Sequence, residues 1–159
     1  NKNKKYWTKK KIVKTKTIDS LHVIPNFIKM DLEGHEVSVI KGAMESLKET
    51  SFCRILLEVH PKFYNQDNDF ADTLRNLFSI NFKIKYIISA GCAQPDLFKE
   101  KGYSPFKIVK TSEYSRGIYK NINPDDAVYF STKEHNQYLP SLQKTSPKIV
   151  RAIMLEKIK

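Results

Sequence analysis

Residues 28–36 read IKMDLEGHE, and residues 56–61 read LLEVHP. Each stretch begins as a short apolar run typical of a buried strand and ends in carboxylates and imidazoles. Apolar residues recur at helical spacing between the two stretches: Val37, Ile40, Met44 and Leu47. This pattern predicts a strand at residues 26–30, a helix at 36–50 and a second strand at 53–59.

The ends of the two predicted strands are expected to meet. A right-handed crossover through a helix makes such strands parallel neighbours, so their carboxyl ends emerge at the same edge of the sheet. Open α/β sheets bind their ligands at this edge. Six polar side chains are therefore expected to converge there as a candidate site: Asp31, Glu33, His35, Glu36, Glu58 and His60.

Asp31 and His60 are the candidates for acid–base chemistry. A carboxylate at the end of a buried strand needs a specific donor to offset its desolvation, which favours a functional role for Asp31. An imidazole can accept a proton near neutral pH, although His60 could equally be a hydrogen-bonded structural residue. Glu58 lies within an apolar strand and is expected to be paired or to face the cleft.

The other members of the group flank Gly34, which permits a tight turn from strand to helix. Glu33 and Glu36 lie where the start of a helix favours negative charge. For Glu36, this structural role and a catalytic role both stay open, and His35 could either bind substrate or face solvent. Carboxylates and imidazoles can also hold a metal ion. However, no H-x-x-x-H or H-E-x-x-H spacing occurs, and no metal site is predicted.

These segments resemble, in their order and spacing, the FkbM family of S-adenosylmethionine-dependent methyltransferases. The resemblance rests on KMDLEGHE at 29–36, IKGA at 40–43 and LEVHP at 57–61, with TIDSL at 17–21 similar to the segment that precedes them in the family. It covers about residues 15–90, and loosely also 126–132 as a final strand.

The resemblance implies an enzyme that transfers a methyl group from S-adenosylmethionine to a hydroxyl of a sugar or another small metabolite. The implied fold is α/β: the C-terminal half of a Rossmann-like class I methyltransferase sheet, mostly parallel with an antiparallel final strand pair. In this framework Asp31 or His60 is the general base. Glu33, Glu58 and His35 would bind the acceptor.

The cofactor-binding elements of such a domain are missing from the sequence. A class I methyltransferase is expected to hold its cofactor on a glycine-rich turn and on an acidic residue after the second strand. No two of the five glycines lie close enough to form a G-x-G turn. Cofactor-binding residues are therefore not assigned. We expect the cofactor half to precede residue 1, or a partner to cover the exposed edge of the sheet.

The net charge of +11 is concentrated at the two ends of the chain. Residues 1–16 hold eight lysines and no acid, residues 142–159 hold five basic residues and one Glu, and the part between them is nearly neutral. This distribution favours solvated tails over a nucleic-acid groove. We predict a basic arm at 1–16, a methyltransferase-like α/β domain at 17–141 and a basic C-terminal helix at 142–159.

The remaining elements follow from local patterns. Asp67-Asn68-Asp69 offers cap chemistry for a helix that carries four apolar residues on one face, and residues 82–89 read as a strand. The four apolar residues are Phe70, Leu74, Leu77 and Phe78. Periodicity fades over residues 90–125, so we expect a long loop there, acting as a lid that sets acceptor specificity.

Cysteine usage and hydropathy favour a cytoplasmic protein. Cys53 and Cys92 lack metal-type spacing, and Cys53 is most simply a small core residue. No signal-peptide run and no stretch of 18 apolar residues occurs. An alternative function stays open: a non-catalytic interaction module or remnant whose lysine-rich ends bind RNA or an anionic surface.

Overall fold

The first two strands pair in parallel, as the strand–helix–strand pattern predicts. β1 (Phe27–Met30) aligns with β2 (Phe52–Glu58) so that Met30 lies opposite Leu57. The structure is a computed structural model, and it describes residues 11–111, 115–139 and 144–158. Residues 1–10 of the predicted basic arm lie outside these ranges, and residues 11–16 are exposed and have no regular secondary structure.

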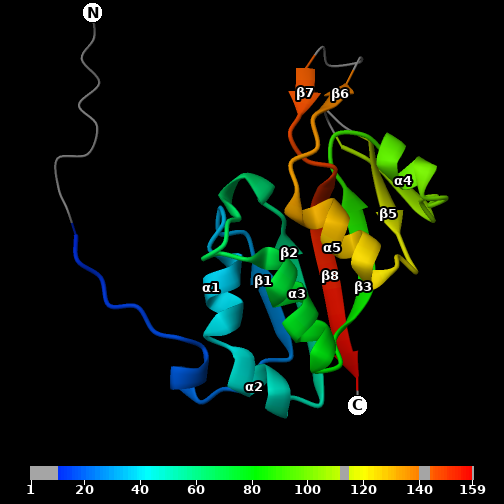
Figure 1. Ribbon diagram of the computed structural model, residues 1–159. Coiled ribbons are helices and arrows are strands. Elements are labelled where there is room, and N and C mark those ends of the chain that lie inside the picture. The colour runs from blue at the N-terminus through cyan, green and yellow to red at the C-terminus, as the bar shows by residue number, and fades with distance from the viewer. Residues whose placement is uncertain (1–10, 112–114, 140–143, 159) are drawn as a thin grey trace, which may run out of the picture.

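The other elements complete an α/β arrangement (Figure 1). They are η1 (Asp19–Leu21), α1 (Glu36–Lys41), α2 (Met44–Glu49), η2 (Pro61–Phe63), α3 (Phe70–Ser79), β3 (Lys83–Ser89), α4 (Asp96–Glu100), β4 (Lys107–Lys110), β5 (Ser115–Tyr119), α5 (Pro124–Thr132), β6 (Gln137–Leu139), β7 (Lys144–Ser146) and β8 (Val150–Ile158).

Six strands form one sheet in the order β1-β2-β8-β3-β5-β4, and β6 and β7 form a separate hairpin. The β1–β2 pair is parallel, whereas the other four pairings of the large sheet are antiparallel. The α/β class is confirmed, but the sheet is mixed rather than mostly parallel. The reason is that β8, the last strand of the chain, runs between β2 and β3 and opposes both (Figure 1).

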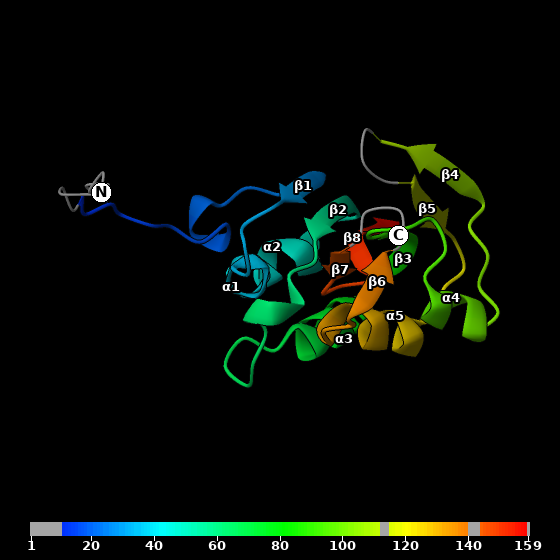
Figure 2. The ribbon, with the colours of Figure 1, turned by 90° about the horizontal axis from the view of Figure 1, so that it is seen from above.

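Helices α1, α3 and α5 lie over one face of the sheet (Figure 2). The β2 side chains on that face, Cys53, Ile55 and Leu57, are fully buried. Cys53 is thus the core residue that the sequence predicts, and burial raises the pKa of its thiol to about 11. Helices in the described part of the chain are all too short or too polar to cross a lipid bilayer.

The single helix predicted for residues 36–50 is wrong, because the chain breaks it into α1 and α2 at Gly42. A Cβ on Gly42 would lie 2.9 Å from the Thr17 side chain, so a segment far away in sequence packs against the break. The carboxylate of Asp19 then accepts hydrogen bonds from the Ser46 amide (2.9 Å) and the Glu45 amide (3.3 Å). This remote side chain caps the start of α2.

The helix predicted after residue 67 and the strand at 82–89 are confirmed as α3 and β3. Asp69 caps α3 by accepting from the Asp72 amide. The long loop expected at 90–125 is wrong, because it contains α4, β4 and β5. β5 pairs with both β3 and β4, and tertiary pairing of this kind leaves little local periodicity in sequence.

The strand predicted at residues 126–132 is also wrong, because these residues belong to helix α5. The side chain of Asn123 accepts from the Asp125 amide at 2.8 Å, Pro124 occupies the first turn, and two acids follow. Those are the start signals of a helix. Ala127, Val128 and Phe130 are buried beneath them.

The helix predicted within residues 142–159 is wrong in the same way, because residues 150–158 form β8 at the centre of the sheet. Burial alternates along it at Ile153, Leu155 and Lys157. Lys157 is only 2% exposed, and its ammonium donates to the Leu47 carbonyl (2.8 Å) and the Lys48 carbonyl (3.0 Å) at the end of α2. Lys157, which the local sequence pattern places in solvent, is therefore buried in the core with its charge capping the end of α2.

Candidate functional site

A strained turn after β1 places two acids at the carboxyl edge of the sheet. Glu33 has φ +51° and Gly34 has φ +100°, values that L-residues rarely adopt. A Cβ on Gly34 would lie 2.4 Å from the Cβ of Phe63, so only glycine fits against η2. Asn68 fastens the turn by donating to the carbonyls of Gly34 and Phe63, both at 2.9 Å.

His60 follows β2 and is the centre of the site. Its side chain is 6% exposed, and its backbone amide donates to the Tyr64 hydroxyl at 3.0 Å. The Tyr64 ring stacks on Phe70 with 4.5 Å between ring centroids, and burial raises the pKa of its hydroxyl. The main chain at His60 is therefore fixed by a neutral phenol that is itself held in the core.

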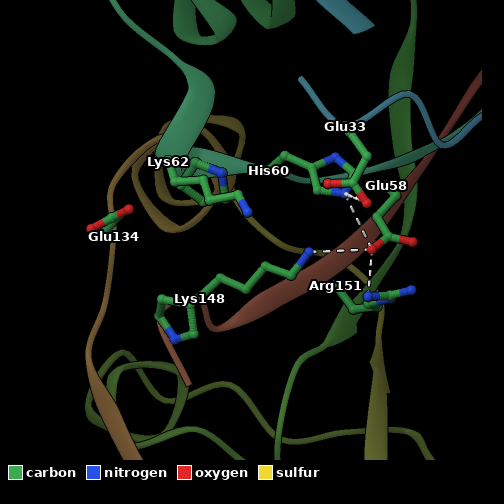
Figure 3. Close-up of a pocket in the computed structure, with 9 residues that line it drawn as sticks. Glu33, Glu58, His60, Lys62, Glu134, Lys148 and Arg151 are labelled. Atoms are coloured by element: carbon green, nitrogen blue, oxygen red, sulfur yellow. Dashed lines mark hydrogen bonds and ion pairs between the residues drawn. The ribbon is translucent and has the colours of Figure 1, made fainter. Parts of the chain in front are cut away.

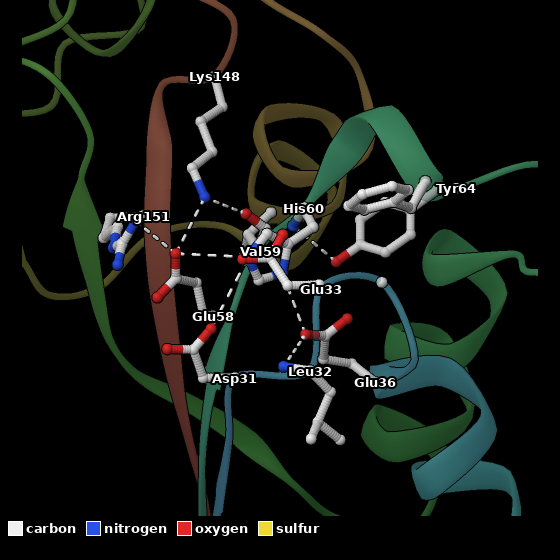
Figure 4. A network of polar contacts seen from close by, with 12 residues as sticks. Asp31, Leu32, Glu33, Glu36, Glu58, Val59, His60, Tyr64, Lys148 and Arg151 are labelled. Atoms are coloured by element: carbon white, nitrogen blue, oxygen red, sulfur yellow. Dashed lines mark hydrogen bonds and ion pairs between the residues drawn. The ribbon is translucent and has the colours of Figure 1, made fainter. Parts of the chain in front are cut away.

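The imidazole of His60 is oriented by Glu36, the first residue of α1 (Figure 4). Nδ1 of His60 lies 3.0 Å from Oε1 of Glu36, and the same oxygen accepts from the Leu32 amide at 2.9 Å. Glu36 is fully buried. A carboxylate against Nδ1 fixes the tautomer in which Nε2 is the proton acceptor.

Three other carboxylates surround Nε2 of His60. Oε1 of Glu58 lies at 3.4 Å, Oδ1 of Asp31 at 3.9 Å and Oε1 of Glu33 at 4.0 Å. These groups would stabilise the ring once it had taken up a proton. The arrangement can therefore accept a proton from a hydroxyl and offer hydrogen-bond acceptors to neighbouring hydroxyls.

Two cations from the C-terminal segment balance Glu58. Lys148 Nζ lies 3.3 Å from Glu58 Oε1 and donates to the Val59 carbonyl at 2.5 Å, and the Arg151 guanidinium pairs with the same carboxylate oxygen. Burial lowers the pKa of the Lys148 ammonium, and Glu58 opposes that shift. Glu58 is thus both paired and at the cleft.

These side chains line a cavity of about 210 Å³ (Figure 3). Its walls are Glu33, Glu58, His60, Pro61, Lys62, Glu134, Pro147, Lys148 and Arg151. Figure 3 shows the contacts of His60, Lys148 and Arg151 meeting at one carboxylate oxygen of Glu58. A cavity of this kind, with convergent polar groups, is the usual form of a small-molecule site.

Asp31, Glu58 and His60 also form a set that could hold a metal ion, because their ligand atoms lie within 4.8 Å of one another. Carboxylate and imidazole ligands suit several divalent ions. A cation here would have to compete with Lys148 and Arg151 for Glu58. That competition disfavours a metal at this position.

Of the residues predicted from sequence, Asp31, Glu33, Glu58 and His60 are brought together, and His35 is not. The His35 side chain is exposed and takes no part in the ion pairs around His60 among the described residues. Sequence reasoning left the role of Glu36 open and missed Lys148 and Arg151, which it placed on a helix. The sequence carries no unambiguous signal for them, because Lys148 precedes β8 and the apolar residues of β8 fit a helical stripe as well as a strand.

Comparison with known proteins adds one match. A family model described as the methyltransferase FkbM domain matches residues 2–84, slightly more than half of the chain. The matched segment contains β1, β2 and all of the acidic and imidazole side chains gathered at His60. No curated protein and no solved structure gives a match.

Proposed function

Since this chain belongs to the FkbM methyltransferase domain family, we propose that it forms the acceptor side of an S-adenosylmethionine-dependent O-methyltransferase. The acceptor would be a hydroxyl of a sugar or another small metabolite. One observation carries the proposal: the buried His60 has Nδ1 held by Glu36 and Nε2 turned toward carboxylates at the cavity. An oriented base is what transfer to a hydroxyl requires.

The residues then take distinct roles. S-adenosylmethionine supplies the methyl group as an electrophile, so the protein must align the acceptor and remove its proton. His60 accepts that proton at Nε2. Asp31 and Glu33 accept hydrogen bonds from the acceptor's hydroxyls, and Asp31 is the second candidate for the base. Glu36 is a positioning residue that acts through His60.

The described residues do not by themselves make a cofactor site. The turn after β1 does not have the G-x-G sequence. Its backbone at Gly34 is packed against Phe63, which leaves no room there for a cofactor. Among the described strands, β1 pairs with β2 alone, which leaves its other edge for a further strand. We propose that the main cofactor contacts come from elements that pair with this edge.

The sheet topology supports the same proposal. β8 runs antiparallel between β2 and β3, and β3 therefore runs in the direction of β1 and β2. A late antiparallel strand is expected in the C-terminal half of a Rossmann-like class I methyltransferase sheet. The alternative function, binding of RNA by lysine-rich ends, is weakened because Lys148, Arg151 and Lys157 are engaged within the fold.

Calorimetric titration of S-adenosylhomocysteine tests the proposal. The 159-residue chain is compared with an upstream-extended protein, which is the same chain together with any coding sequence found before it. We expect binding by the extended protein and none by the shorter one. Binding by both would place the cofactor contacts within these residues and overturn their assignment to the β1 edge. Binding by neither would contradict the methyltransferase proposal.

A further inference from the structure

A second cavity, of about 320 Å³, adjoins the one at His60. The two share a wall made of Pro147, Lys148 and Arg151. The second cavity is lined by Ala90, Gly91, Arg116, Leu139, Thr145, Ser146, Pro147, Lys148 and Arg151. It therefore lies over the end of β3 and the start of β8, beyond His60 as seen from β1.

The two cavities differ in charge. The first one is lined by three carboxylates, Glu33, Glu58 and Glu134, which balance three basic side chains, Lys62, Lys148 and Arg151. The lining of the second, as far as the structure describes it, carries three basic side chains and no carboxylate. Glu58 pairs with both cations of the shared wall, Lys148 and Arg151, and Arg116, which also makes an interaction within the chain, lines the second cavity on its far side.

The cations of the shared wall are held in place by contacts within the fold. Lys148 has a side chain only 16% exposed, and its ammonium is fixed by Glu58 and the Val59 carbonyl. Its backbone carbonyl accepts from the Ser146 hydroxyl at 2.7 Å, which ties the lining of the second cavity to the same segment. Removing cations from water is unfavourable unless an anion faces them. Glu58 carries one charge against Lys148 and Arg151, and Glu33 also acts on Lys148.

Sheet order sets the direction in which a ligand can lie. Along the carboxyl edge, Asp31 follows β1, His60 follows β2, Lys148 precedes β8 and Gly91 follows β3. A small molecule with a hydroxyl at Nε2 of His60 can therefore extend across Lys148 and Arg151 into the second cavity. The side toward β1 stays available for the methyl donor.

We propose that the methyl acceptor carries an anionic group, a carboxylate or a phosphate, which binds between Arg116, Lys148 and Arg151 while its hydroxyl reaches His60. The inference deepens the proposed function and rests on it. Guanidinium groups bind both anions in bidentate geometry, so the shared chemistry is that of a planar or tetrahedral oxyanion.

The test is an NMR titration of the ¹⁵N-labelled 159-residue chain with three sugars that differ in one substituent: glucuronate, glucose 6-phosphate and glucose. We expect one or both anions to shift the backbone amide signals of Gly91 and Ser146 saturably, and glucose to leave them unchanged. The two anionic sugars distinguish a carboxylate from a phosphate preference. No shift with either anion, or equal shifts with glucose, would overturn the proposal.

Two variants that each remove one positive charge, at different places, test where the anion binds. Arg116→Gln should weaken binding of the anionic sugar about tenfold or more, because a charge-assisted hydrogen bond is lost. Arg75→Gln removes the same charge from an exposed position on α3, outside both cavities, and should leave binding unchanged. Equal effects of the two variants would show that binding follows net charge and would overturn the site.

Competition separates this inference from the proposed function. In the upstream-extended protein, saturating S-adenosylhomocysteine should leave the anionic sugar bound. Displacement would assign the basic cavity to the carboxylate of the cofactor and overturn the acceptor site, with the methyltransferase proposal intact. Failure of S-adenosylhomocysteine to bind at all would instead contradict the methyltransferase proposal, whatever the sugar result.

Discussion

Oε1 of Glu36 is shared between Nδ1 of His60, at 3.0 Å, and the Leu32 amide, at 2.9 Å. One buried carboxylate oxygen thus ties the imidazole after β2 to the turn after β1. This atom links the segments that follow β1 and β2, so the orientation of the His60 imidazole depends on the geometry of the turn after β1 (Figure 4).

Glu36→Ala is expected to lower the free energy of unfolding by about 2–4 kcal/mol, because the buried His60 imidazole and the part-buried Leu32 amide lose their acceptor together. Glu36→Gln keeps an acceptor oxygen and should lose less. Urea denaturation followed by circular dichroism measures both. Glu45→Ala is the control, since Glu45 has a side chain 72% exposed and pairs with Lys48 at the surface. Equal losses at the two positions would contradict the role of Glu36.

The acidic half of the site, which is Asp31, Glu33, Glu58 and His60, could be predicted from sequence. These residues lie at or just after the ends of two strands that the sequence pattern indicates. A parallel crossover fixes where Asp31 and His60 must meet, whatever the rest of the fold does. His35 was placed in the same group by proximity in sequence alone. The turn at Glu33 and Gly34 directs it outward instead, and backbone angles of this kind cannot be derived from residue type.

The basic half of the site, which is Lys148 and Arg151, could not be predicted. Its position depends on β8, and residues 150–158 form a strand because they pair with β2 and β3. Val150, Ile153 and Met154 fit a helical stripe as well as a strand pattern, and a charged residue at 157 argues for a solvated end. Lys157 is buried because the last carbonyls of α2 accept hydrogen bonds from its ammonium. Once β8 is a central strand, Lys148 and Arg151 come to face Glu58.

Lys157→Met should lower the free energy of unfolding by about 1–3 kcal/mol, although methionine preserves the apolar stem. The loss arises because the Leu47 and Lys48 carbonyls are left without this donor, and because the ammonium no longer faces the Phe82 ring. Thermal and urea unfolding provide the measurement. Lys48→Met, at a half-exposed side chain, should change stability by no more than about 0.5 kcal/mol. An unchanged free energy of unfolding in Lys157→Met would show that the hydrogen bonds to the Leu47 and Lys48 carbonyls contribute nothing to stability.

Stability should fall in acid partly through Asp19. Hydrogen bonds from Ser46 lower the pKa of this carboxyl below its usual value in the folded state. A lowered folded pKa means that Asp19 stabilises the fold above the pKa of the unfolded chain, about 3.9, and that this contribution is lost as pH falls through the folded pKa.

The difference in unfolding free energy between wild type and Asp19→Ala should therefore be largest near pH 6 and shrink below about pH 4. Urea melts at pH 6, 4 and 3 measure it. Glu49→Ala, an exposed carboxylate at the end of α2, provides the comparison. A difference for Asp19→Ala that is the same at all three pH values would mean that the cap acts through shape and not through charge.

One histidine inside the site and one outside it, His60 and His35, allow the catalytic assignment to be tested with a matched control. In the upstream-extended protein, His60→Ala should reduce methyl transfer about 10²- to 10⁴-fold, the usual contribution of a positioned general base. Affinity for S-adenosylhomocysteine should be retained, because the proton acceptor does not hold the methyl donor. Added imidazole should restore part of the rate, which a purely structural defect would not allow.

His35→Ala is the matched control, since His35 precedes α1 and faces solvent. It should leave both the rate and the KM for the acceptor unchanged. A raised KM would instead support the acceptor-binding role predicted from sequence and would require the turn after β1 to rearrange when the acceptor binds. A full rate in His60→Ala would transfer the role of base to Asp31, the other candidate, whose Oδ1 lies 3.9 Å from Nε2 of His60.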